Sequence, residues 1–385
     1  MPGEVPSNAD QRGPASSKPF TVATDFQRPV FCILGLPFDA VTERAAIATV
    51  REAALVGRRC FLSTPNLNFA VGCRTDDQFR ESVLRSDLSV VDGMPLVWIA
   101  KALGLPFHER VAGSSLFDDL RRPGPTPLTT YLFGGPDGVA EQACRALNAS
   151  PDSMHCVGFR SPGFGSIAQI SSSDIIAAIN ASQADLLVVA LGAKKGQAWI
   201  LRNLDQLQTP VVSHLGAVIN FVAGTVTRAP RRWQRLGLEW FWRIRQEPQL
   251  WRRYAADGVA LSRLLVTRIV PGMIAARLRR PDGIDFQRAT VHSTMGASNS
   301  IVMSGAWGAD NLQPLRDAFT STSLTASEIV VDLAAVTWID SACVGLLLLL
   351  KGHQAKVGQR LTLRHPTTTV RRHLRNHCAE FLLEP

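Results

Sequence analysis

Polar residues that could do chemistry follow three apolar runs typical of β-strands. The segments are 63–66 (STPN), 90–95 (VVDGMP) and 132–138 (LFGGPDG). Asp92 follows one such run and precedes a glycine, and partial burial of a carboxyl group there raises its pKa towards the range of a general base. The same position also suits an aspartate that caps the next helix. Asp92 is therefore a candidate base with a structural alternative.

The third segment has the pattern strand, glycine-rich turn, helix. Gly134 and Gly135 would let backbone N–H groups and the start of the helix approach a diphosphate. An ordinary tight turn between a strand and a helix has the same pattern. The segment alone supports both interpretations equally.

The elements that must position these residues alternate from residue 29 to about 224. Strands are expected at 30–34, 60–63, 88–91, 130–133, 154–157, 186–191 and 210–214, and helices at 42–57, 75–86, 138–147 and 173–182. This alternation predicts an α/β fold with a mostly parallel sheet and helices on both faces. Substrates bind at the carboxyl ends of the strands in such sheets, where the three segments would lie.

The net charge of +9 is concentrated in one stretch. Thirteen arginines and three acidic residues lie between 228 and 280, and four of the eight tryptophans lie within 226–254. Tryptophan beside arginine is typical of membrane interfaces, and each basic residue near an anionic surface contributes about 1 kcal/mol. A helix pair packed on the protein with solvated arginines is the alternative. No nucleic-acid-binding module is recognisable, so we expect no nucleic-acid partner.

The remaining composition narrows the class of protein. Seven scattered cysteines without a CxxC pair argue against a disulfide framework or a structural zinc site and indicate a reducing compartment. No DxD triplet occurs, so we expect neither a metal ion nor a cofactor, and arginines would have to bind any diphosphate. No stretch approaches the roughly 18 apolar residues of a membrane span, and the N-terminus lacks a secretory pattern. Residues 1–28, rich in Pro, Ser and Gly, are expected to be a disordered tail.

A break at 281–283 (PDG) precedes a second α/β unit. Strands are expected at 300–303, 328–332 and 360–364, and helices at 312–320 and 341–356. The roughly 95 residues from 290 onward suffice for one small domain.

Several separate motifs occur in the order and spacing of a known family. Segment 63–113 contains TPN, VVDGMPLVWIAKALGLP and ERVAG, and segment 228–254 contains Ala229-Pro230, Gly237-Leu238-Glu239-Trp240, Arg243, Glu247-Pro248 and Arg252-Arg253-Tyr254. Through these motifs residues 29–254 resemble the WecG/TagA/CpsF glycosyltransferases.

The resemblance implies a Rossmann-like sheet and an inverting, UDP-sugar-dependent hexosyltransferase, often specific for UDP-N-acetylmannosamine. Its acceptor would be a polyprenyl-diphosphate-linked sugar. The resemblance also implies roles for single residues: Asp92 is the base, Thr64 and Asn66 line the substrate pocket, and Arg110 lies close by. Arg243 and Arg252, on a C-terminal appendage, would help to bind the diphosphate and reach the membrane.

The chain departs from the family pattern in three places. Where relatives often read G-x-PKQE-x-W, residues 192–199 read GAKKGQAW, so the glutamine expected near the nucleotide is displaced and Gln197 is its candidate. Ser115 stands where an aspartate is common, and residues 249–250 (QL) stand where relatives often have another arginine. These differences concern the donor sugar more than the reaction type.

Residues 290–385 resemble STAS domains, the fold of anti-sigma-factor antagonists, through the runs IVVDL at 329–333 and VTWIDSACVG at 336–345. In regulatory STAS domains the serine after the aspartate is a kinase target, here Ser341. A phosphate there would add negative charge at a helix N-terminus. A helix-capping role for Ser341 is the alternative. The resemblance implies a protein partner for this domain.

The sequence therefore predicts a glycosyltransferase of bacterial surface or exopolysaccharide synthesis, peripheral on the cytoplasmic face of the plasma membrane. Its expected parts are the tail (1–28), the transferase domain (29–225), an Arg/Trp-rich appendage (226–254), a basic amphipathic linker (255–289) and a STAS-like domain (290–385). The alternative is a regulatory protein that binds sugar nucleotides and acts through the STAS-like domain. The intact TPN, DG and ERVxG motifs favour catalysis.

Overall fold

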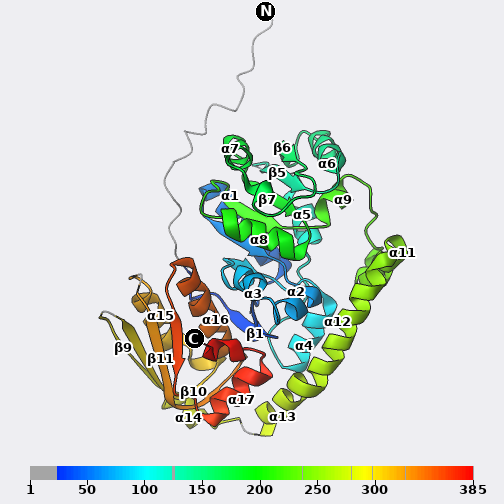
Figure 1. Cartoon of the computed structure of the whole chain (residues 1–385). Coiled ribbons are helices and arrows are strands. Elements are labelled where there is room, and N and C mark those ends of the chain that lie inside the picture. Colours follow the sequence, from blue (N-terminus) through cyan, green and yellow to red (C-terminus); the bar gives the residue numbers. More distant parts are fainter. Residues whose placement is uncertain are drawn as a thin grey trace, which may run out of the picture.

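The computed structural model describes residues 24–384 apart from 124, 125, 236, 279, 297 and 326. Figure 1 shows two α/β bodies in contact, with a long helix running along one side of both. Residues 1–23 of the expected tail lie outside the described residues. Residues 24–28 are placed, and they differ from a disordered tail: Phe26 is buried, and Arg28 is buried beside Asp39 with 2.6 Å between its Nη2 and Oδ2.

The larger body contains a six-stranded parallel sheet. Its order is β4 (Leu88–Ser89), β3 (Cys60–Ser63), β8 (Val211–His214), β7 (Leu186–Ala190), β5 (Thr129–Gly134) and β6 (His155–Arg160). Alternate residues of each strand face opposite sides. In β7, Leu186 and Val188 join one hydrophobic cluster, whereas Leu187 and Val189 join another. The sheet is therefore buried on both faces, as the continuous apolar runs predict.

Helices cover both faces. One face packs against α1 (Glu43–Val56), α5 (Gly113–Leu120), α6 (Val139–Asn148) and α9 (Val218–Val222). The other packs against α7 (Ser173–Ala181), α8 (Ala193–Asn203) and the short η2 (Gln169–Ser171). A third cluster combines α2 (Leu67–Gly72), α3 (Asp77–Leu84) and α4 (Met94–Ala102) with the first two strands.

Those first two strands form a separate hairpin. The strand expected at 30–34 is β1 (Val30–Ile33), which pairs antiparallel with β2 (Leu36–Asp39) and not with the main sheet. Leu34 and Gly35 both have positive φ, at 53° and 83°, and make the turn. The hairpin thus lies between the main sheet and the second body.

The appendage begins with α10 (Arg231–Arg235) and α11 (Glu239–Gln246). One continuous helix then runs from Pro248 to Leu278 through η3 (Pro248–Leu250), α12 (Trp251–Leu264), the π-helical η4 (Leu265–Ile269) and α13 (Val270–Leu278). The π-helical turn precedes Pro271, which cannot donate a backbone hydrogen bond and disturbs the preceding turn. The expected boundary between appendage and linker, at 254, falls inside α12.

This continuous helix is, by length and composition, apolar enough to cross a membrane. The arginines within it interrupt the apolar run, which is why the sequence predicts no span. Only 11% of its most apolar window is buried in the protein. It nevertheless contacts both bodies, because α12 packs on α2 and η4 and α13 pack on α17 (Thr368–Asn376). Arg268 pairs with Glu380 at 2.8 Å.

The second body contains a four-stranded sheet of order β12 (Leu361–Arg364), β11 (Ile329–Ile339), β10 (Asn299–Trp307) and β9 (Thr290–Thr294). Its pairs are parallel except for β9 with β10, which is antiparallel. The helices and short helical turns are α14 (Gly283–Gln287), η5 (Ala309–Asn311), α15 (Gln313–Thr322), α16 (Ser341–Lys356), α17 and η6 (Glu380–Leu383). This small α/β domain matches the predicted fold, and β9 is an addition to it.

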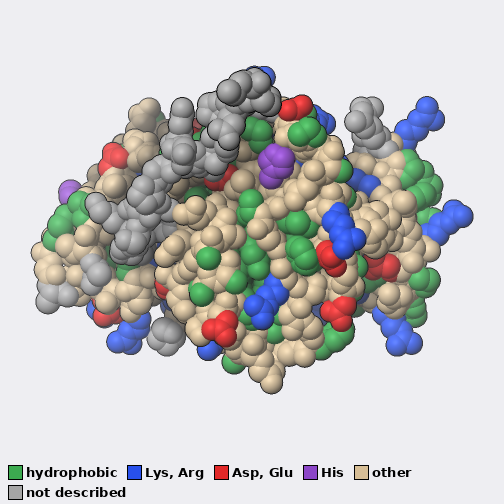
Figure 2. Space-filling view, turned by 90° about the horizontal axis from the view of Figure 1, so that it is seen from above, with side chains coloured by type: hydrophobic (Ala, Val, Ile, Leu, Met, Phe, Trp, Pro, Cys, Tyr) green, Lys and Arg blue, Asp and Glu red, His purple; other side chains and the backbone are tan. Residues whose placement is uncertain are grey.

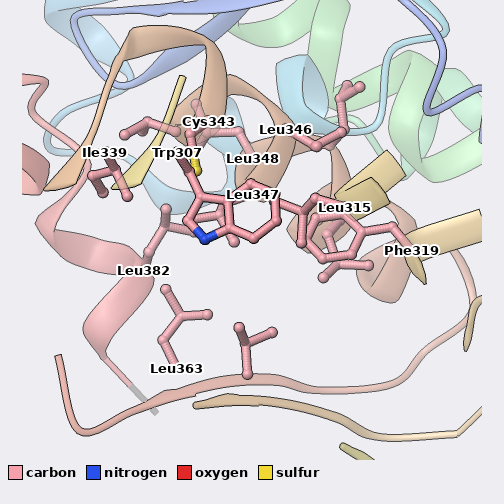
Figure 3. Packing of buried hydrophobic residues seen from close by; sticks show 14 of the residues in the cluster. Trp307, Leu315, Phe319, Ile339, Cys343, Leu346, Leu347, Leu348, Leu363 and Leu382 are labelled. Carbon is pink, nitrogen blue, oxygen red and sulfur yellow. The ribbon is translucent and has the colours of Figure 1, made fainter. Parts of the chain in front are cut away.

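The two bodies share a hydrophobic core. Helix α16 contributes Cys343, Leu346, Leu347 and Leu348 to a cluster that also contains Trp307 and Phe319, as Figure 3 shows. The same cluster includes Phe26, Val30, Cys32 and Leu84 from the first body. Lys356 at the end of α16 pairs with Asp87 at 2.6 Å. The second body is therefore packed onto the first and does not hang from it by a linker.

Candidate active site

Backbone hydrogen bonds place the segments after β3 and β4 side by side. The N–H of Asp92 donates to the carbonyl of Pro65 at 3.0 Å. Asn66 caps α2 by accepting from the N–H of Phe69 at 3.3 Å. Gly93 has φ +149°, and a Cβ there would lie 3.6 Å from Cβ of Asn66. The TPN and DG motifs therefore form one cluster at the carboxyl ends of adjacent strands.

The carboxylate of Asp92 points to the start of α5. Its Oδ2 accepts from the N–H of Gly113, the first residue of α5, at 3.2 Å. A Cβ on Gly113 would lie 3.1 Å from Oγ1 of Thr64, so Thr64 lies beside this contact. The next helix along the chain, α4, has Gly93 as its N-cap and no side-chain cap. The structure thus contradicts the alternative in which Asp92 caps the following helix.

Opposing effects set the charge of Asp92. Burial, the largest effect, raises its pKa, and the charge of Glu239 raises it further. The charges of Arg110 and Arg228 and the hydrogen bond from Gly113 lower it. The net shift of the pKa is upward. A raised carboxyl pKa is nearer to the range that suits a general base. Arg110 and Arg228 oppose this shift, since a nearby positive charge favours a carboxylate.

Arg110 is fixed by the appendage. Its Nη1 and Nη2 donate to the two carboxylate oxygens of Glu239, at 2.6 and 3.0 Å, and its side chain is only 12% exposed. Burial alone lowers the pKa of Arg110, but the Glu239 hydrogen bond and the charges of Asp92, Glu239 and Glu43 outweigh it and raise the pKa. Two-point pairing of this kind holds a guanidinium in one orientation. Glu239, from the LEW motif, is a site residue that sequence reasoning did not single out.

A second contact brings the appendage over the Asp92 cluster. A Cβ at Gly237 would lie 2.9 Å from Cβ of Met94 and 3.2 Å from the ring of Trp98. Gly237 has φ +73°, a conformation that favours glycine. The appendage therefore closes on the N-terminal end of α4, directly after Asp92 and Gly93.

The glycine-rich turn lies farther along the sheet edge. The N–H of Gly135 donates to the carbonyl of Ala190 at 2.9 Å, and a Cβ on Gly134 would lie 2.5 Å from that carbonyl oxygen. These glycines allow β5 and β7 to end in close contact, as in a tight turn. Three strands separate β4 from β5, which is about 19 Å at about 4.8 Å per strand. Gly134 and Gly135 thus lie on the same sheet edge as Asp92 but outside its immediate cluster.

Gln197 points into the protein and not to the surface. It is 0% exposed, and its Nε2 donates to Oγ of Ser63 at 3.2 Å. His214, which ends β8, is 7% exposed, and its ring lies against Gly196, the residue before Gln197. The only signal in the sequence is a histidine at the end of a short strand, after Val211, Val212 and Ser213.

The remaining arginines lie on or near the appendage. Arg243 pairs with Glu247 at 3.4 Å, and Arg252 is exposed beside Trp251. In the described part of the chain no ion pair joins either arginine to Asp92. Arg228 pairs with Asp118 at 2.9 Å and also donates to Ser115, the residue that stands where relatives often have an aspartate.

Comparison with known proteins identifies the family and the added domain. The model of the Glycosyl transferase WecG/TagA/CpsF family matches residues 31–272, well over half of the chain. The chain belongs to this family. A second model, the Mlab, STAS domain, matches residues 292–377. The chain is thus a WecG/TagA/CpsF glycosyltransferase fused to a STAS domain, as predicted.

Several curated proteins similar to this WecG/TagA/CpsF transferase share one name. An N-acetylglucosaminyldiphosphoundecaprenol N-acetyl-beta-D-mannosaminyltransferase of Bacillus spizizenii is 24% identical over 50% of this chain and 74% of its own length. Proteins of the same name from two strains of Staphylococcus aureus are 23% and 24% identical, over 57% and 55% of this chain and 85% and 82% of their own lengths. Each of these similarities covers between 50% and 57% of this chain.

In this fused transferase, Ser341 lies at the interface between the two bodies. It is 4% exposed, and its Oγ donates to the carbonyl of Cys32 in β1 at 2.9 Å. The cap of α16 is Asp340, which accepts from the N–H of Cys343 at 2.8 Å, so the capping alternative for Ser341 is wrong. A kinase could reach Ser341 only after α16 had separated from β1.

Proposed function

We propose that this transferase moves an N-acetylmannosamine-type or related hexose from a UDP-sugar to a polyprenyl-diphosphate-linked sugar, with inversion at the anomeric carbon. The observation that carries the proposal is the Asp92 cluster: a carboxylate held at the start of α5, flanked by Thr64, Asn66 and Arg110 and covered by the appendage. The names of the relatives supply the acceptor class and the sugar.

The proposed reaction requires a general base for the acceptor hydroxyl and positive charge near the leaving diphosphate. Asp92 accepts the proton of an acceptor hydroxyl as its oxygen attacks the anomeric carbon, and the bond from that carbon to the UDP oxygen breaks. A single displacement inverts the configuration. Because UDP leaves with negative charge, arginines near it stabilise the transition state. Arg243 and Arg252, on the appendage, are the candidates for that role.

The acceptor's polyprenyl chain lies in a membrane, and the long helix has a surface that suits contact with one. Val259, Val266, Val270 and Ile274 are spaced by seven, four and four residues and are 72%, 72%, 46% and 53% exposed. Residues four or seven apart share one face of a helix. Figure 2 shows basic side chains projecting at one edge of the molecule with hydrophobic ones between them. The helix also contacts α2 and α17, so we propose peripheral docking on the cytoplasmic face of an anionic membrane and not a span.

The decisive assay measures UDP release from a panel of UDP-sugars with a short-chain prenyl-diphosphate-linked acceptor. Asp92→Asn should lower turnover by roughly 100- to 10,000-fold, the usual contribution of a general base. Asp152→Asn, at an exposed loop, is the matched control and should leave turnover unchanged. Near-wild-type turnover by folded Asp92→Asn would show that Asp92 is not the base. Absence of turnover with every UDP-sugar would reject the function itself.

A further inference from the structure

His214 lies at the carboxyl end of β8 with its ring held between two glycines. A Cβ at Gly196 would lie 3.1 Å from both Cγ and Nε2 of His214 and closer still to Cδ2. A Cβ at Gly216 would lie 3.1 Å from Nε2. Phe69 of α2 faces the ring, with 6.2 Å between centroids. The imidazole therefore fills a space that exists because residues 196 and 216 have no side chains.

Two buried polar atoms in this place have no hydrogen-bond partner. Among the described residues nothing bonds to Nε2 of His214 or to Oε1 of Gln197. Buried polar groups are nearly always paired in native proteins, so each such atom needs an explanation. Gln197 donates to Ser63 of β3, which precedes Thr64 of the TPN motif, and His214 ends β8, the strand that pairs with β3. A polar group of a ligand at this edge would pair them.

The sequence departure at 192–199 falls at the same place. Aligning GAKKGQAW with G-x-PKQE-x-W puts Gly196 where relatives have glutamine, and Gln197 where they have glutamate. The displaced glutamine is therefore not replaced by Gln197, which points towards Ser63. The imidazole of His214 occupies the space where a side chain at position 196 would begin.

We propose that His214 contacts the sugar of the donor and takes over the position of the missing glutamine, with Nε2 hydrogen-bonded to a hydroxyl or amide of the sugar being transferred. The proposal rests on the proposed function. The missing glutamine is expected near the donor nucleotide, and the proposal assigns the sugar end of the donor because β8 is only two strands from β4, about 10 Å, and the sugar must lie beside Asp92. Burial lowers the pKa of His214 to about 4, so the ring is neutral and suits an uncharged partner better than a diphosphate.

The test compares donor binding and turnover in full-length variants. His214→Ala should lower kcat/KM for the preferred UDP-sugar about tenfold, the effect of losing one buried hydrogen bond, and leave the Kd of UDP within about twofold. Gly196→Gln combined with His214→Ala should recover most of the loss and change the order of preference among UDP-sugars. His292→Ala, at an exposed position of β9, is the control and should change neither quantity.

Should His214→Ala fail to fold, Gly196→Ala is the second variant, because its Cβ forces the ring of His214 aside while keeping the histidine. We expect Gly196→Ala to lower kcat/KM for the UDP-sugar to the same extent and to leave the Kd of UDP unchanged. Unchanged kcat/KM in a folded His214 or Gly196 variant overturns the proposal while leaving the transferase function intact. Equal weakening of UDP and UDP-sugar also overturns it, since the contact would then be with the nucleotide. A wild-type protein that turns over no UDP-sugar would reject both the proposal on His214 and the proposed transferase function.

Discussion

Gly352 of α16 offers the sharpest test of how the STAS domain is joined to the transferase. A Cβ on Gly352 would lie 2.7 Å from the carbonyl carbon of Leu84, at the end of α3, and closer still to its oxygen. A backbone carbonyl cannot rotate away as a side chain can. Gly352→Ala therefore has to push α16 and α3 apart, and the rest of the interface with them.

Two effects of known size oppose each other in this variant. Replacing a glycine inside a helix by alanine stabilises the helix by about 1 kcal/mol. Overpacking a well-packed contact costs about 1–3 kcal/mol, and this contact is backbone, so the upper part of that range applies. We expect Gly352→Ala to lower the free energy of unfolding by about 1–2 kcal/mol. Gly258→Ala in α12, where nothing lies within 4 Å of the added Cβ, should raise it by up to about 1 kcal/mol.

Thermal or urea unfolding of both variants measures the difference, and its sign is the result that matters. If Gly352→Ala stabilises the protein as Gly258→Ala does, α16 does not press on Leu84 and the two bodies are not docked. The same geometry predicts what happens when the chain is cut near Pro281. Such a cut removes most of a core that Phe26, Val30 and Leu84 share with α16. A loss of activity in the shortened chain would therefore have to be separated from a loss of folding.

Three further outcomes are expected. Activity should fall as pH decreases through the pKa of Asp92, which lies above that of an ordinary aspartate. Arg110→Gln should shift this fall in activity to higher pH and Glu239→Gln should shift it to lower pH. Shifts of both variants in the same direction would contradict the electrostatic account. Transfer should proceed without added divalent metal, because the sequence has no DxD motif; activity abolished by EDTA and restored by magnesium or manganese would reveal a metal site. Val266→Asp with Val270→Asp should weaken co-sedimentation with anionic vesicles, whereas Leu324→Asp, at a more exposed position of the STAS domain, should not. Binding of the wild type should weaken as salt rises, and equal binding to neutral vesicles would refute the docking proposal.

Local pattern was sufficient for the parallel sheet and for the motif clusters at its edge. The continuous apolar run at 186–191 became β7, buried on both faces, and the helix expected at 341–356 is α16 with the same bounds. Asp92, Thr64 and Asn66 meet because the carboxyl ends of neighbouring parallel strands lie at one edge. That rule needs only the strand positions, which explains why the cluster could be predicted.

Contacts between distant segments were not predictable in the same way. The pairing of Arg110 with Glu239 joins residues far apart in the chain, and neither motif alone indicates the other as its partner. The run at 30–34 was predicted as a strand, but apolar composition does not tell which sheet it joins. β9 is exposed at nearly every position and has no apolar alternation to reveal it.

One signal of the domain contact was present in the sequence. The run from 342 to 350 is apolar on every side of α16, and a helix without a polar face must be buried on both sides. One small four-stranded sheet covers only one side. The other side therefore required a partner, and the structure supplies it from the chain itself: β1 and the end of α3, which Gly345 and Gly352 allow α16 to approach closely.

This arrangement changes how a regulatory role for the STAS domain would have to work. In the docked state the hydroxyl of Ser341 bonds to β1, whose hairpin belongs to the same hydrophobic cluster as α4, the helix that follows Asp92. A phosphate cannot be accommodated there without breaking that bond and separating α16 from β1, because a charged group in an apolar interface is strongly disfavoured. Ser341→Asp should therefore act on the junction, lowering stability and, through the hairpin, turnover. Unchanged turnover would instead be expected if the STAS domain were independent of the transferase. A Ser341→Asp protein as stable and as active as wild type, with Ser341→Ala as control, would mean that the junction opens at little cost and that the serine is accessible after all.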